Sequence, residues 1–146
     1  MRNNKFLSIV IPAYNVGKKI DRCLNSIFKV DSELIEVIVI DDGSTDDTID
    51  YLNKYSDKIT VIRQSNKGVG HARNAGILEA RGKYIWFVDA DDEVKMSYEI
   101  LQLLKKREDS LIMFGYNIID GDKKRTVVSS LNKKIPINNI SKYFDI

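Results

Sequence analysis

Short apolar runs alternate with polar, helix-like segments over the first 90 residues of the chain. The runs are rich in β-branched and aromatic side chains, a composition typical of buried strands. We expect strands at residues 6–11, 35–40, 59–63 and 84–88. Pro12 follows the first run and is expected to end that strand, because proline has no N–H to donate to a sheet.

Helical periodicity fills the intervals between these runs. Apolar side chains recur every three or four positions over 18–28, which predicts an amphipathic helix. Ser44-Thr45-Asp46-Asp47 offers capping side chains for a second helix through about Tyr55, and Gly82 closes a third that ends near Ala80. This alternation predicts an α/β fold with a Rossmann-like, mostly parallel sheet and helices on both of its faces.

The alternation also predicts where a ligand would bind. Right-handed crossovers place the C-terminal ends of parallel strands along one edge of the sheet, and open α/β sheets bind ligands there. Four polar clusters follow the four predicted strands: Ala13-Tyr14-Asn15, Asp41-Asp42-Gly43-Ser44, Gln64 to Gly68, and Asp89 to Asp92. We therefore expect these clusters to form one site.

The pattern changes after Ser97. A further amphipathic helix is expected to about Arg107, followed by a strand at 111–114 and a hairpin over 117–128. Residues 138–146 begin another helical pattern.

Composition narrows the possible function. A chain of 146 residues with 43% hydrophobic side chains is long enough for one domain with a core, and too apolar for a disordered chain. One Cys and one His exclude a disulfide framework and a Cys- or multi-His metal site, so any metal must be held by oxygen ligands. No apolar run approaches the ~20 residues of a membrane helix, and no signal peptide is evident, so we expect a cytoplasmic protein.

The charge of the chain adds little to what composition says about function. The formal net charge is +2; residues 1–100 carry 14 basic and 16 acidic side chains, and residues 101–146 carry 9 and 5. The basic C-terminal third is more simply an ordinary solvated surface than a membrane contact, although contact with the inner membrane face stays open. We expect no nucleic-acid partner.

Asp89-x-Asp91, with Asp92 beside it, is the candidate metal site. Mg²⁺ and Mn²⁺ are typically held by one or two carboxylates together with substrate phosphate oxygens. The alternative is a helix cap in a solvated acidic loop. In the turn after the second strand, one aspartate is expected to be structural and the other, Asp42, to accept a hydrogen bond from a ligand.

The segment from Asn66 through Lys67 and Gly68 to Arg73 joins a glycine-containing loop to a helix start. Backbone N–H groups and basic side chains there favour an anion such as a diphosphate. The spacing is neither that of a P-loop nor Gly-x-Gly-x-x-Gly. For Arg73 a salt bridge to an acidic cluster is an equal alternative.

With these residues assembled, the chain closely resembles the family 2 glycosyltransferases of the GT-A fold. Four blocks carry the resemblance in order: Ser8 to Asn15, Glu36 to Asp46, Asn66-x-Gly68-x-x-x-Ala72-Arg73-Asn74-x-Gly76, and Gly82 to Asp92. The resemblance implies transfer of a sugar, with inversion, from a nucleotide-diphosphate donor, most often a UDP-sugar, to an acceptor hydroxyl. A glycan or lipid-linked acceptor in bacterial surface polysaccharide synthesis would follow family precedent.

The resemblance also implies roles for individual residues. Asp91 would coordinate Mn²⁺ or Mg²⁺ together with Asp89, which would also face the ribose and the sugar. The remaining nucleotide-sugar contacts are expected from residues in the matched blocks: Pro12, Ala13, Tyr14, Asn15, Asp41, Asp42, Asn66, Lys67, Gly68, Arg73 and Ala90.

The catalytic base is the one departure from the family pattern. Only 54 residues follow Asp92, and none of their carboxylates stands in a context typical of that base. We expect the base beyond Ile146, and the chain to be the donor-binding half of a longer enzyme. On this interpretation residues 1–95 form the nucleotide-binding core, and 96–146 begin the acceptor side. Apolar surface left uncovered would allow self-association. A non-catalytic nucleotide-sugar-binding module, or an inactive donor half, is the alternative.

Overall fold

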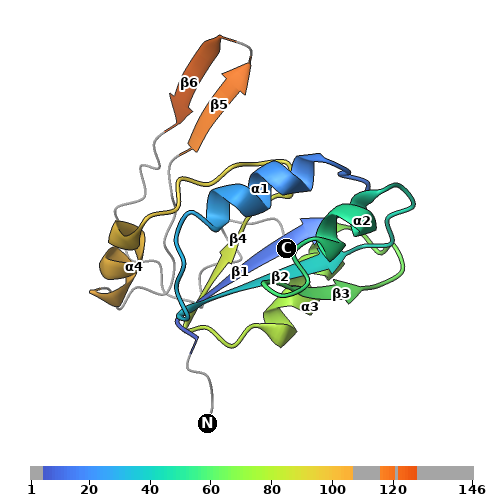
Figure 1. The fold of residues 1–146 in the computed structure, drawn as a ribbon, viewed down its shortest axis with the longest axis horizontal. Coiled ribbons are helices and arrows are strands. Elements are labelled where there is room, and N and C mark those ends of the chain that lie inside the picture. The colour runs from blue at the N-terminus through green and yellow to red at the C-terminus, as the bar shows by residue number, and fades with distance from the viewer. Residues whose placement is uncertain (1–4, 107–115, 121, 128–146) are drawn as a thin grey trace, which may run out of the picture. The chain divides into compact units, whose positions relative to one another are not determined.

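Four parallel strands form one sheet in the order β3-β2-β1-β4 (Figure 1). The computed structural model describes residues 5–106, 116–120 and 122–127. The strands are β1 (Leu7–Ala13), β2 (Ile35–Asp41), β3 (Thr60–Arg63) and β4 (Tyr84–Phe87). Their parallel pairing confirms the predicted sheet.

Helices cover both faces of this sheet, as predicted. α1 (Lys19–Ile27) and α2 (Thr48–Asn53) connect strands that step in the same direction across the sheet, so right-handed crossovers place both on one face. α3 (Val69–Glu79) leads from β3 back across to β4 and therefore lies on the opposite face (Figure 1). The second helix, expected to reach about Tyr55, ends at Asn53.

The core is built around β1, in which every residue is buried. A central strand covered by helices on both faces must be apolar throughout, and this explains its near-continuous hydrophobic sequence. The expectation that Pro12 ends the strand is wrong, because β1 continues to Ala13 and Pro12 pairs in register with Ile40. The backbone of Pro12 faces β4, like that of Val10, whose carbonyl accepts from Val88 N. β1 pairs with β4 only as far as Val10. No residue of β4 therefore lies opposite Pro12 to accept a hydrogen bond, and the missing N–H of the proline costs the sheet nothing.

α3 approaches the sheet most closely at Gly76. A Cβ atom there would lie 2.2 Å from Cγ1 of Val10 in β1. Ala72, one turn earlier, packs with Ile38 and Ile40 of β2 on the same face. Small side chains at these two positions let α3 lie directly on β1 and β2, which holds the loop before the helix near the C-terminal edge of the sheet.

The contacts of the chain divide it into two units, Met1–Tyr98 and Glu99–Ile146. α4 (Tyr98–Lys105) begins where the first unit ends, as predicted, and β5 (Tyr116–Asp120) pairs antiparallel with β6 (Lys123–Val127), which confirms the predicted hairpin. The strand predicted at 111–114 and the helix predicted at 138–146 lie outside the described residues. The division of function at residue 95 stays a prediction. Within the described ranges, no helix is long and apolar enough to span a membrane.

Gly76→Ala is expected to lower the free energy of unfolding by about 1–3 kcal/mol, because the added methyl group overlaps Val10. Gly70→Ala in the same helix is the matched control, since its Cβ would meet nothing within 4 Å, and a change of no more than about 1 kcal/mol is expected. Urea unfolding of both variants measures the difference. Equal stability of the two variants would contradict this packing.

Candidate functional site

The strand order creates a ligand-binding position between β1 and β4. The crossover that leaves β1 runs over one face of the sheet, and the crossover that enters β4 runs over the other. Open α/β sheets bind ligands outside the carboxyl ends of strands at such a switch point. The segments 13–15 and 89–92 leave the sheet from these two adjacent strands, and Asp42 follows the neighbouring β2.

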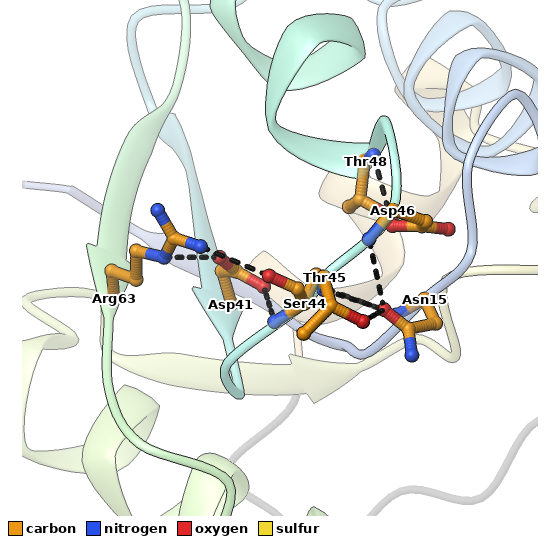
Figure 2. Close-up of polar contacts among 7 residues, drawn as sticks. All are labelled: Asn15, Asp41, Ser44, Thr45, Asp46, Thr48 and Arg63. Carbon is orange, nitrogen blue, oxygen red and sulfur yellow. Dashed lines mark hydrogen bonds and ion pairs between the residues drawn. The ribbon is translucent and has the colours of Figure 1, made fainter.

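Asp41, the last residue of β2, points inward and is fully buried. Its Oδ1 accepts a hydrogen bond from Ser44 N at 2.9 Å, and its Oδ2 forms an ion pair with Arg63 Nε at 3.1 Å (Figure 2). Arg63 also donates from its guanidinium to Ser44 O at 2.9 Å. Asp41 therefore braces the turn after β2 against β3. This is the structural role that sequence analysis expected of one aspartate in the pair.

Asp42 is also buried, but its carboxylate faces the loop after β3. It accepts hydrogen bonds from Gln64 Nε2 at 2.7 Å, Lys67 N at 2.9 Å and Gly68 N at 2.8 Å. Burial raises the pKa of this carboxyl, but the three donors outweigh burial and hold the pKa below its ordinary value. Asp42 thus fixes the course of residues 64–68.

Gly43 lets that loop come close to β2. Its φ is +78°, and a Cβ atom would lie 2.8 Å from the backbone nitrogen of Asn66. A side chain at position 43 would be strained by the backbone and would collide with the loop that Asp42 holds. Among the predicted loop residues, Asn66, Lys67 and Gly68 are all exposed.

The loop after β1 is held by Asn15. This residue adopts φ +50°; its Oδ1 accepts from Thr45 N at 2.8 Å, and its own N–H donates to Ser44 Oγ at 3.0 Å (Figure 2). The Asn15 side chain therefore connects two loops of the site. Beside it, the Tyr14 side chain is 47% exposed, whereas Pro12 and Ala13 are buried at the end of β1.

The acidic segment after β4 alternates between buried and exposed residues. Val88 and Ala90 are buried, while Asp89, Asp91 and Asp92 are exposed. Arg73 of α3 forms an ion pair with Asp89 at 2.8 Å, which confirms the salt bridge weighed as one alternative for this arginine. Burial, and then the charges of Asp91 and Asp89, raise the pKa of the Asp92 carboxyl. Negative charge is thus concentrated here.

α1 supports the acidic segment from the other face of the sheet. Ser26 Oγ accepts from Val94 N at 2.9 Å, and Cys23 Sγ lies 3.7 Å from Asp89 O. Burial, followed by the neighbouring aspartates, raises the pKa of the Cys23 thiol to about 12. Cys23 is therefore a packing residue, as its apolar helix face suggests, and not a thiolate ligand.

The carboxylate oxygens on this edge could supply some of the ligands of a hard divalent cation. Asp89 and Asp91 present exposed carboxylates, the ligand type that Mg²⁺ and Mn²⁺ prefer. No group of three or more His, Cys, Asp or Glu side chains in the described part of the chain is arranged to hold a metal. Protein ligands would therefore fill only part of the coordination sphere, and phosphate or water oxygens would complete it.

Sequence analysis did not identify the residues that hold these loops. Gln64, Thr48 and Ser26 each hydrogen-bond across loops that are far apart in the chain. These long-range contacts leave no local spacing signal in the sequence. Of the four residues expected to cap the second helix, Asp46 is the one whose side chain accepts from Thr48 N, at 3.0 Å.

Comparison with known proteins decides the family. The sequence pattern of glycosyl transferase family 2 matches residues 8–145. The chain belongs to glycosyl transferase family 2. It is 38% identical over 113 residues to the uncharacterized glycosyltransferase YibD of Escherichia coli, covering 75% of this chain and 33% of that protein. The chain thus spans about a third of the length of this family member.

Solved structures share the fold. The S. aureus TarS 1–349 structure in complex with UDP-GlcNAc superposes with a TM-score of 0.62 and 35% identity, over 67% of this chain and 30% of that one. Glucosyl-3-phosphoglycerate synthase from Mycobacterium tuberculosis, solved with Mn²⁺, UDP and glucosyl-3-phosphoglycerate, gives a TM-score of 0.53 and 26% identity, over 61% and 36%. Family 2 membership and the GT-A fold are both confirmed.

Asp42→Asn is expected to be less stable than the unsubstituted chain at pH 7, with the difference shrinking below about pH 4. A lowered folded-state pKa contributes stability above the unfolded value of about 3.9, and this contribution is lost as the pH falls through the folded value. Urea unfolding between pH 7 and pH 2.5 measures it, with Asp57→Asn as an exposed control. A pH-independent difference would show that the Asp42 charge does not hold the loop.

Proposed function

We propose that this chain is the donor-binding part of an inverting glycosyltransferase that uses a nucleotide-diphosphate sugar, in the first place a UDP-sugar. The observation that carries the proposal is that three loops, at residues 13–15, 64–68 and 89–92, meet at the switch point of the sheet. Hydrogen bonds of Asp42 and Asn15 hold these loops, while Tyr14, Lys67, Asp89 and Asp91 are exposed to solvent. The S. aureus TarS complex with UDP-GlcNAc supports a nucleotide-sugar donor.

The nucleoside would lie over the loops after β1 and β2. The half-exposed ring of Tyr14 offers an aromatic surface for a base, with Ala13 and Asn15 on either side of it. Asp42 holds the loop of Asn66, Lys67 and Gly68 in place, and a carboxylate has lone pairs beyond those used by three donors. We assign to this remaining capacity a hydrogen bond from the base or the ribose.

The diphosphate would lie between Lys67 and the acidic segment. We assign Asp91, with Asp89, as the carboxylates that hold Mn²⁺ or Mg²⁺; the Mn²⁺ in the M. tuberculosis enzyme supports this. A bound cation would neutralise the charge that develops on the departing nucleoside diphosphate. Arg73 fixes the Asp89 carboxylate at 2.8 Å and adds positive charge beside the phosphates. Ala90 lies between the two aspartates and is buried, and with its side chain directed inward both aspartates are exposed to solvent.

Transfer also requires a base for the acceptor hydroxyl. We assign that base to a carboxylate outside this chain, in the acceptor-binding remainder of an enzyme of the length seen in relatives. The acceptor we propose is a glycan or lipid-linked sugar of a bacterial surface polysaccharide, glycosylated on the cytoplasmic side of the membrane. The alternative function is a nucleotide-sugar-binding module without turnover, favoured by the lack of a recognisable base among residues 93–146.

UDP titrated calorimetrically into the chain is expected to bind more tightly with Mn²⁺ than without it, because the cation bridges carboxylate and diphosphate charges. Asp91→Asn is expected to abolish the Mn²⁺ dependence. Asp57→Asn, which removes one exposed carboxylate from the turn before β3, should leave the dependence unchanged.

If UDP, GDP, CDP and dTDP all give no binding signal in this titration, with and without metal, the result would contradict a donor site. Because the base is assigned outside this chain, binding without transfer by the chain alone fits both functions. Transfer of labelled sugar by a full-length enzyme that contains this chain would favour the transferase, and binding without transfer by that enzyme would favour the non-catalytic module.

A further inference from the structure

The hydroxyl group of Thr48 has all of its hydrogen-bonding capacity in use. Its oxygen accepts from Val16 N at 3.0 Å and from Gly17 N at 2.9 Å, and its proton is donated to Asp46 Oδ1. A threonine hydroxyl has one donor and two acceptor positions, and all three are filled here. Thr48 is fully buried, so each of these bonds is made away from water.

The two N–H groups belong to the loop that carries Tyr14. This loop leaves β1 at Ala13 and reverses direction through Asn15 and Gly17, whose φ values are +50° and +47°. Beyond Ala13 the sheet ladder no longer holds the backbone. The loop is instead held by two sets of contacts from the α2 side: Ser44 and Thr45 on Asn15, and Thr48 on Val16 and Gly17.

Asp46 determines which way the Thr48 hydroxyl points. Its carboxylate accepts from both Thr48 N, at 3.0 Å, and Thr48 Oγ1, and it lies on the same turn as Thr45 (Figure 2). With the proton directed at Asp46, both lone pairs of Thr48 Oγ1 face the loop. Asp46 itself is exposed, so its removal leaves the core intact.

We propose that Thr48, oriented by Asp46, is a positioning residue of the donor site that fixes residues 14–17 and thereby the ring of Tyr14. The inference rests on the proposed function, because it concerns the same nucleotide site. Neither residue touches the ligand. Their effect on binding comes from ordering the Tyr14 loop before the nucleotide binds. If the loop were not ordered in advance, the entropy cost of ordering it would reduce the binding free energy.

The test is UDP affinity in the presence of Mn²⁺, measured by calorimetry on the chain and four variants. Thr48→Val keeps the shape but removes the hydroxyl, and is expected to weaken UDP binding by about tenfold or more. Thr48→Ser retains the hydroxyl and should stay within about threefold of the unsubstituted chain. Asp46→Ala should weaken binding by about threefold to tenfold, whereas Asp57→Ala, with the same charge change at an exposed position in the turn before β3, should not.

Thermal unfolding and the binding stoichiometry show that each variant is folded. If Thr48→Val does not fold, the comparison of Asp46→Ala with Asp57→Ala decides. The proposal is overturned if the folded Thr48→Val and Asp46→Ala variants bind UDP as tightly as the unsubstituted chain, because Thr48 would then only stabilise the fold. Failure of the unsubstituted chain to bind any nucleoside diphosphate is a different result, which defeats the proposed function and this inference together.

Discussion

Asp41 at the end of β2 and Asp42 directly after it are almost completely buried, and the surrounding segments compensate the two carboxylates with hydrogen bonds and an ion pair. Burying an unpaired charge costs far more than a protein of this size gains from any single contact. The charge of Asp41 is compensated by a hydrogen bond from Ser44 N and an ion pair with Arg63, and Asp42 accepts hydrogen bonds from the loop at residues 64–68. Satisfying these two groups fixes the turn before α2 and the loop before α3.

This arrangement divides the residues of the edge by function. The buried Asp41, Asp42 and Thr48, together with the exposed Asn15, hold the loops, while other exposed side chains of the same loops are left for a ligand. Tyr14, Lys67 and Asp91 belong to the exposed set, and they offer respectively an aromatic face, a cation and a carboxylate. These three kinds of contact suit a nucleotide-diphosphate sugar with a divalent cation, and the proposed donor function rests on them.

Sequence reasoning could predict the sheet, its helices and the edge where the polar clusters meet, because hydrophobic periodicity and crossover handedness are strong constraints. It failed at Pro12. Proline is tolerated there because β4 pairs with β1 only as far as Val10, and the length of that pairing depends on tertiary structure that the local sequence does not reveal. It also could not identify the hydrogen bonds of Thr48, which join residues 31 and 32 positions apart. Periodicity carries no information about such pairs.

The measurement that tests the central claim most directly is an ¹⁵N NMR titration of the chain with UDP and then Mn²⁺. If the three loops form one donor site, UDP should shift the amide signals of 13–15 and 64–68, and Mn²⁺ should broaden those of 89–92 selectively. Broadening centred on another acidic segment, such as that around Asp122, or UDP shifts confined to a single loop, would contradict the account.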